Sequence, residues 1–214
     1  RLVVGIGGGS TEFAIGGRFE PRQLESLQVG CVTYSRECFP DGELSKRNYT
    51  RAYERACLEI SHIRRDFRRR HWEEAIGSSG TLQAIEGILG AESWSDSAIT
   101  RKGLQRMRKA LLRYRRFDDI ELGGLSAARR SVIAAGLAIT EAVFDVLEIE
   151  VMRSSPGALR EGVIYDLVGR LEHEDVRERT ISALLSRYHA DESTAQTVAR
   201  RARAIFDAIH SDWG

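Results

Sequence analysis

Short apolar runs separated by glycine open the chain. Leu2–Ile6 and residues 11–15 predict two strands, and a third strand is expected within residues 18–29, after a Gly16-Gly17 turn. Residues 7–10 (Gly-Gly-Gly-Ser) join the first two strands. Because glycine tolerates positive φ angles, this connection favours a tight hairpin rather than the start of a helix.

Helical periodicity follows. Apolar residues recur at steps of four, three, four, three and four, at Tyr49, Tyr53, Ala56, Ile60, Ile63 and Phe67. This stripe predicts a buried helix face, and Ser45 is placed to cap the helix. Residues 31–39 are expected to form a short helical link. Further helices are expected after residue 81, after Thr100, from Ser126 to Leu147 and over residues 158–171, with strands at 72–76 and 149–152.

The resulting order is three strands, a helix, a strand, a helix, an inserted helix, a helix, a strand and a helix. It predicts an α/β fold with a mixed sheet (βββαβαβα) and helices on both faces. This is the order of the ribonuclease-H-like domain of actin-like ATPases, in which phosphate binds at the first hairpin. Two helical stripes beyond residue 172 predict additional C-terminal helices; they comprise Ile181, Leu184, Leu185 and Tyr188, then Ala195, Val198, Ala202, Ile205 and Ile209.

The composition narrows the function classes. Among 214 residues, 32 are basic and 31 acidic, and the net charge of +1 gives no overall attraction to nucleic acid or membranes. No apolar run has the length of a membrane span, and no signal peptide is visible. Cys31, Cys38 and Cys57 lack metal-type spacing and predict buried thiols in a reducing cytoplasm. The first residue is not Met and lies almost within a strand, so we expect a piece of a longer protein.

Two loops are candidates for binding phosphate. They comprise Gly7, Gly8, Gly9, Ser10 and Thr11 in the hairpin, and Gly77, Ser78, Ser79, Gly80 and Thr81 before a helix. Glycine lets a ligand approach the main chain, and converging N–H groups bind anions. A helix N-terminus adds free N–H groups and the positive end of the dipole. A purely structural hairpin at the first loop and ordinary helix capping at the second remain alternatives.

Other chemistries fit less well. The first loop lacks the immediate helix of a dinucleotide fingerprint and the lysine of a P-loop. The five histidines show no zinc spacing, and Ser78 and Ser79 do not form a nucleophile elbow. The arginine-rich stretches 64–70 and 106–116 are open to two interpretations, a path for a polyanion or solvated helix faces.

Five motifs in matching order make the chain resemble the exopolyphosphatase and guanosine pentaphosphate phosphohydrolase family. The family signature D-I-G-G-G-S-T-E corresponds to Gly5 through Glu12. The other matches are Gly30-Cys31-Val32, Phe39-Pro40-Asp41-Gly42, Gly77-Ser78-Ser79-Gly80-Thr81 and Ala158-Leu159-Arg160-Glu161-Gly162. The resemblance implies that residues 1–172 form the second actin-like domain and that residues 173–214 begin an all-helical domain.

The resemblance also implies an activity, namely Mg²⁺-dependent release of terminal orthophosphate from inorganic polyphosphate or pppGpp. Glu12 matches an acidic family residue that acts at the metal or on the attacking water, which makes it the candidate catalytic and metal-binding residue. The two loops would hold the phosphate. Arg160 has two candidate uses, contact with a phosphate or an ion pair at the last strand–helix turn.

Two departures from the family pattern bear on this activity. Gly5 stands where the family has aspartate, so one carboxylate for the metal or water is absent. The family's first actin-like domain is absent too, and we expect the isolated chain to be inactive or nearly so. The alternative function is a non-catalytic phosphate- or nucleotide-binding regulatory module. The amphipathic C-terminal helices favour a homodimer.

Overall fold

The computed structural model describes residues 1–17, 20–171, 181, 184–185, 187–189 and 191–209. The chain forms two compact units, Arg1–Ala158 and Leu159–Gly214, and each is described by itself. The domain boundary predicted between residues 172 and 173 lies outside the described residues and stays a prediction.

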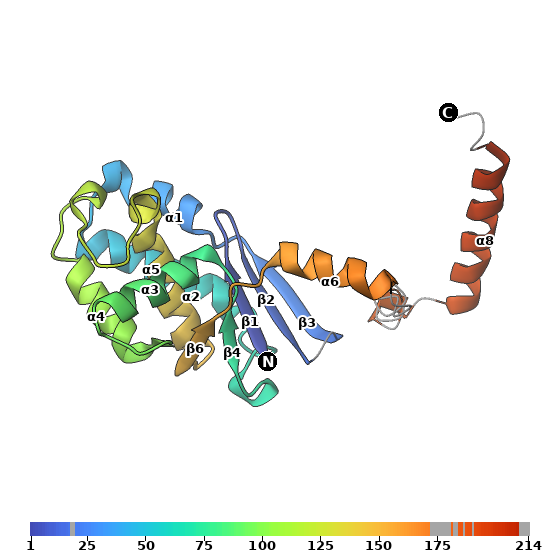
Figure 1. Cartoon of the computed structure of the whole chain (residues 1–214), viewed down its shortest axis with the longest axis horizontal. Helices are drawn as coiled ribbons and strands as arrows, with labels where there is room; N and C mark the ends of the chain where they lie inside the picture. Colours follow the sequence, from blue (N-terminus) through green and yellow to red (C-terminus); the bar gives the residue numbers. More distant parts are fainter. Residues whose placement is uncertain (18–19, 172–180, 182–183, 186, 190, 210–214) are drawn as a thin grey trace. The chain divides into compact units, whose positions relative to one another are not determined.

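A mixed six-stranded sheet organises the first unit (Figure 1). Its strands are β1 (Leu2–Ile6), β2 (Thr11–Gly17), β3 (Glu20–Leu27), β4 (Ala75–Gly77), β5 (Ile99–Thr100) and β6 (Val151–Ser154), in the spatial order β3-β2-β1-β4-β6-β5. The first three strands form an antiparallel meander, whereas β1, β4 and β6 run parallel. β5 pairs antiparallel with β6 at the edge.

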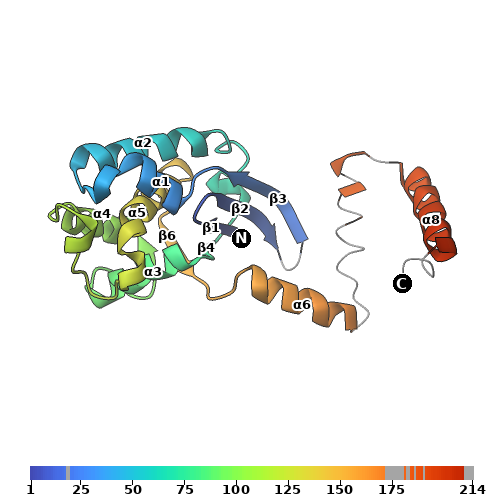
Figure 2. The same ribbon diagram turned by 90° about the horizontal axis from the view of Figure 1, so that it is seen from above.

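Helices of the first unit pack on one another and on the sheet. They are α1 (Cys31–Cys38), α2 (Lys46–Ser61), α3 (Gly80–Ala91), α4 (Arg101–Leu111) and α5 (Arg130–Val146). The mostly buried α5 contacts the other four, and Figure 2 shows α1, α2 and α5 side by side. The second unit contains α6 (Leu159–Leu171) and α8 (Glu192–Ile209).

Alternation along the first strands separates a core face from a face that carries polar groups. Leu2, Val4 and Ile6 on β1 and Phe13 on β2 are fully or almost fully buried. The ring centres of Phe13 and Phe67 lie 6.0 Å apart. Because neighbouring side chains in a strand point to opposite faces, Glu12 lies on the other face and is exposed. The buried face anchors the hairpin, and the other face leaves its carboxylate accessible.

The predicted α/β class and mixed sheet are confirmed, with shifts at element ends. α2 ends at Ser61, and Ile63 and Phe67 are buried from the turns that follow. β4 and β6 begin later than predicted, and α5 is preceded by a 3-10 turn at Ala127–Arg129. The two-residue strand β5 was missed because it is too short for a periodic signal.

Three further expectations have different outcomes. Ser45 caps α2 as predicted, and Thr100, after which a helix is expected, caps α4; they accept hydrogen bonds from the N–H groups of Asn48 and Gly103. Helices on both faces of the sheet stay a prediction, because α6 belongs to the second unit. Part of the stripe from Ile181 to Tyr188 lies outside the described residues.

The structure also bears on the predicted buried thiols and on the predicted homodimer. Cys31 and Cys38 are buried thiols as predicted, whereas Cys57 is only partly buried, and all three are free. On α8, Val198 and Ile205 are 61% and 62% exposed; the homodimer stays a prediction. Among the described residues, no helix combines the length and the apolar character that a bilayer crossing requires.

A buried carboxylate joins α2, α4 and α5. Glu141 is 5% exposed and accepts hydrogen bonds from the Tyr49 hydroxyl at 2.8 Å and from Arg108 at 3.2 Å. Burial raises the pKa of Glu141, although both hydrogen-bond partners oppose the shift and Asp145 adds to it. One turn along α5, Asp145 accepts a hydrogen bond from Tyr53 at 2.7 Å, so polar contacts fix α2 against α5 at two levels.

The raised pKa of Glu141 predicts that the stability of the protein depends on pH. A raised pKa means that the folded state keeps a proton that the unfolded chain releases near pH 4.5. The free energy of unfolding should therefore fall as the pH rises from 4.5 through the folded-state pKa of Glu141. Urea unfolding over this pH range should show a flatter dependence for Glu141→Gln. The exposed Glu54→Gln on α2 is the control, and equal slopes for the wild type and Glu141→Gln would contradict the prediction.

Candidate functional site

Both predicted loops lie at one edge of the sheet. Since β1, β4 and β6 are parallel, the segments that follow them leave the sheet at the same edge. The Ser78 N–H donates to the Val4 carbonyl at 2.8 Å, and the Ser155 N–H donates to the Gly77 carbonyl at 2.8 Å. The structure therefore brings together the two loops that the sequence singles out.

The hairpin loop is held from behind by the N-terminus of α1. The N–H groups of Cys31 and Val32 donate to the carbonyls of Gly7 and Gly8, both at 2.9 Å. In a trans peptide the carbonyl and the following N–H point in opposite directions. The N–H groups of Gly8 and Gly9 therefore point away from α1, and no acceptor among the described residues takes them. They are free to bind an anion.

Gly30 lets this loop sit against the helix. A Cβ added at Gly30 would lie 2.2 Å from the Gly8 carbonyl oxygen and 2.3 Å from the Gly9 carbonyl carbon. Both are backbone atoms and cannot rotate away. Only glycine fits at this close approach.

The second loop begins α3. Ser79 caps the helix by accepting a hydrogen bond from the Leu82 N–H at 3.3 Å. The N–H groups of Gly80 and Thr81 lie in the first turn, where no intrahelical carbonyl can accept them. Among the described residues no other acceptor takes them, so this loop has the same kind of free donors as Gly8 and Gly9.

Several predicted side chains are engaged elsewhere. Thr11 is fully buried and donates to the Val29 carbonyl, and Thr81 is 4% exposed with its hydroxyl 3.7 Å from Cys31 Sγ. Both threonines can reach an anion only through the main chain. Ser78 donates to the Gly157 carbonyl at 2.5 Å, and Gly77 sits in β4 against Leu82.

Glu12 carries the carboxylate beside the hairpin loop. Its Oε1 accepts a hydrogen bond from Ser10 at 2.5 Å and a longer one from Ser26 at 3.4 Å. Its Oε2 lies 3.7 Å from the position that a Cβ at Gly5 would occupy and 4.0 Å from that of Gly7. The carboxylate therefore lies beside the end of β1, and its Oε2 is available to a ligand.

Arg129 lies at the candidate site, although the sequence did not single it out. Its Nη2 lies 2.0 Å from the Cβ position of Gly80, so the guanidinium covers the first turn of α3. Among the described residues, no carboxylate forms an ion pair with it. One feature of the sequence could have indicated a role for Arg129. Arg129 and Arg130 stand at the N-terminus of the apolar helix α5, where the helix dipole disfavours positive charge.

Arg160 belongs to the second unit, which is described by itself. It lies on α6 in the second unit and donates to Glu161, its neighbour in the chain, at 2.7 Å. Its side chain is 82% exposed. Both uses considered from the sequence remain predictions.

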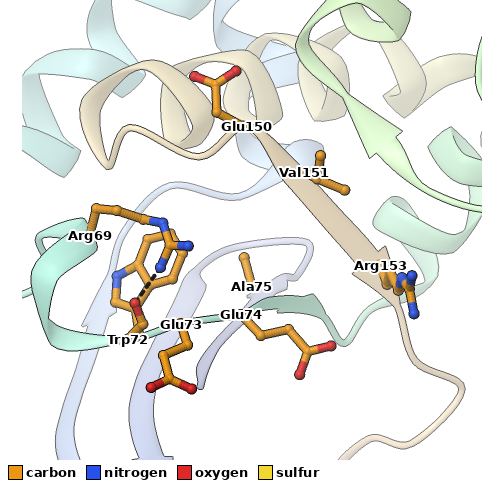
Figure 3. A pocket seen from close by; sticks show the side chains of 8 residues that line it. All are labelled: Arg69, Trp72, Glu73, Glu74, Ala75, Glu150, Val151 and Arg153. Atoms are coloured by element: carbon orange, nitrogen blue, oxygen red, sulfur yellow. Dashed lines mark hydrogen bonds between the residues drawn. The ribbon is translucent and has the colours of Figure 1, made fainter.

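A separate pocket of about 380 Å³ lies where β4 and β6 begin, away from the loops that follow these strands (Figure 3). Its lining comprises Arg69, Trp72, Glu73, Glu74, Ala75, Glu150, Val151 and Arg153. Arg69 stacks on Trp72 with its guanidinium carbon 4.5 Å from the ring centre, and Glu74 and Glu150 pair with Arg1 and Arg101. Most of its charges are already satisfied, so it is a poorer candidate than the loops.

Known proteins resemble the chain in sequence and in fold. A model of the Ppx/GppA phosphatase family matches residues 1–171. The guanosine-5'-triphosphate,3'-diphosphate pyrophosphatase of Photobacterium profundum is 39% identical over 213 residues, which cover all of this chain and 43% of that protein. The chain thus spans less than half the length of this relative.

Solved structures show the same fold. The crystal structure of the Aquifex aeolicus Ppx/GppA family member superposes with a TM-score of 0.66 at 22% identity, covering 79% of this chain and 56% of that one. An exopolyphosphatase from Cytophaga hutchinsonii superposes with a TM-score of 0.63 at 20% identity, covering 78% of this chain and 56% of that one.

Proposed function

This chain belongs to the Ppx/GppA phosphatase family, and on that premise we propose that it is part of a phosphohydrolase that releases terminal orthophosphate from polyphosphate or pppGpp. One observation carries the proposal. The free N–H groups of Gly8 and Gly9 and those of Gly80 and Thr81 stand at the same edge of the sheet. Both substrates end in a phosphoanhydride, which such donors bind through its charged oxygens.

Hydrolysis of a phosphoanhydride needs groups that position the phosphate and stabilise its charge, and this site contains such groups. Phosphoryl transfer depends on positioning and on stabilising charge at the phosphoryl oxygens. Main-chain donors hold those oxygens, and Arg129 above Gly80 can bind two of them with its planar fork. Glu12, held by Ser10, is available to orient the attacking water. Each donor–oxygen bond to a charged group contributes about 1.5–3 kcal/mol.

The family resemblance also implies Mg²⁺, and the residues fit one mode of binding it. Mg²⁺ in phosphate-handling sites often takes one or two carboxylates, the phosphates themselves and several waters. Glu12 would be the carboxylate ligand. In the part of the chain that the structure describes, no three acidic, histidine or cysteine groups lie so that they could hold a metal ion together, and the phosphates and water would be the other ligands. When bound, the ion would neutralise charge on the phosphoryl oxygens.

We propose that catalysis needs more than this chain. Relatives named for the whole activity are more than twice its length, so the isolated chain would supply one wall of a cleft and be inactive or nearly so. Gly5 favours a second candidate, a phosphate- or nucleotide-binding regulatory module. At this position the chain lacks the carboxylate that the family signature would set beside Glu12.

Binding of phosphate ligands tests the proposal and the part of Arg129 in it. Isothermal titration of the 214-residue chain should show binding of tripolyphosphate and of pppGpp, and their relative affinities will separate the two substrate classes. Arg129→Ala should weaken binding about 10- to 100-fold, because it removes a charge-assisted pair of hydrogen bonds. Arg129→Lys should recover part of the loss, since lysine keeps the charge without the fork.

The exposed Arg65→Ala after α2 is the matched control and should bind like the wild type. Equal affinities for Arg129→Ala and the wild type would exclude Arg129 from the site. If neither ligand binds, the proposed function is wrong. Steady release of orthophosphate from polyphosphate by the isolated chain would instead contradict the proposed need for a second wall.

A further inference from the structure

Three helices of the first unit meet directly behind the two loops. Cys31 of α1 and Thr81 of α3 are each 4% exposed, and the Thr81 hydroxyl lies 3.7 Å from Cys31 Sγ. Gly136 in the buried middle of α5 faces both. A Cβ there would lie 2.6 Å from Thr81 Cγ2 and 3.9 Å from Cys31 Cβ.

Two of these residues stand at the roots of the loops. Cys31 is the first residue of α1, and its N–H holds the Gly7 carbonyl of the hairpin loop. Thr81 is the second residue of α3 and itself supplies one of the free N–H groups. A displacement of either helix end therefore moves one set of donors relative to the other.

We infer that Cys31, Thr81 and Gly136 form a positioning junction that sets the spacing between the two sets of anion-binding N–H groups. The inference rests on the proposed function for its ligand, a phosphate. The contacts that form the junction do not depend on that function. Protein interiors are close-packed and transmit displacements instead of absorbing them. Because Gly136 has no side chain, the first turn of α3 approaches α5 closely enough for Thr81 to touch Cys31.

A compensating pair of substitutions tests the junction. Gly136→Ala should push Thr81 and the start of α3 away from α1, and tripolyphosphate affinity should fall about tenfold. Thr81→Ser removes the Cγ2 atom that the new methyl would strike, so Gly136→Ala/Thr81→Ser should recover most of the affinity. Gly90→Ala, which meets nothing within 4 Å at the end of α3, is the control.

Thiol reactivity gives a second measurement that needs no ligand. In the native 214-residue chain, Gly136→Ala should speed modification of buried Cys31 by a thiol reagent about tenfold. The rate depends on the free energy of the local opening that exposes the thiol, and the added methyl group should lower that free energy. The partly buried Cys57 on α2 reports on general loosening and should keep its rate. Thr81→Ser should slow Cys31 again in the double variant.

The outcomes separate the two proposals. Unchanged affinity and unchanged Cys31 reactivity in Gly136→Ala would overturn the junction, as would a double variant no better than the single one. A parallel rise at Cys31 and Cys57 would mean general destabilisation and would also overturn it. If the wild type binds neither tripolyphosphate nor pppGpp, the proposed function fails, and Cys31 reactivity alone decides the junction.

Discussion

Gly30→Ala is expected to displace the hairpin loop and to weaken tripolyphosphate binding by about 100-fold. The new methyl would meet the Gly8 carbonyl oxygen at 2.2 Å and the Gly9 carbonyl carbon at 2.3 Å. The loop must move, because backbone atoms have no rotamer to change. The hydrogen bonds that the loop accepts from the N–H groups of Cys31, Val32 and Thr33 at the start of α1 would then be strained or lost. Overpacking of this kind costs about 1–3 kcal/mol of folding stability.

Titration calorimetry and urea unfolding of the same protein samples measure both effects. Gly87→Ala on α3 is the matched control, since its methyl meets nothing within 4 Å. That control should bind normally and gain up to about 1 kcal/mol of stability from its better helix propensity. Wild-type affinity in Gly30→Ala would show that the hairpin loop does not hold the anion.

Gly5→Asp is expected to create a two-carboxylate metal site. A Cβ at Gly5 would lie 3.3 Å from the Ser78 carbonyl oxygen and 3.7 Å from Glu12 Oε2, so a small side chain fits after a slight adjustment. The added carboxylate would stand beside that of Glu12. Two adjacent negative charges repel each other without a cation and become ligands when Mg²⁺ is present. The variant should therefore be less stable than the wild type without Mg²⁺ and be stabilised by adding it.

The effect on catalysis should be larger still. In a hybrid protein that joins this chain to the remaining part of the Photobacterium profundum relative, Gly5→Asp should raise Mg²⁺-dependent phosphate release about 100-fold or more. Gly5→Asn tests shape without charge and should give no gain. Adding Glu12→Gln to Gly5→Asp should cancel the gain. If Gly5→Asp leaves both Mg²⁺ binding and phosphate release unchanged, the carboxylate missing at this position does not limit the site.

Local patterns were enough for much of the fold. The short apolar runs separated by glycine and the stripe from Tyr49 to Phe67 placed the first strands and a long helix, because each pattern lies within one short stretch of the chain. Ser45 and Thr100 marked helix starts, since a cap bonds to an N–H three residues away. The two-residue β5 escaped detection because its pairing with β6 depends on residues far along the chain.

The sequence alone therefore singled out two loops as candidates for binding phosphate, because glycine content and strand order are properties of the chain itself. Only the tertiary structure decided how those loops are built. It turned the side chains of Thr11 and Thr81 into the core, set Gly30 against Gly8 and laid Arg129 over Gly80. These contacts join residues more than twenty positions apart, or bury a side chain among distant neighbours. Packing selects them, and no local periodicity records which distant residues will meet.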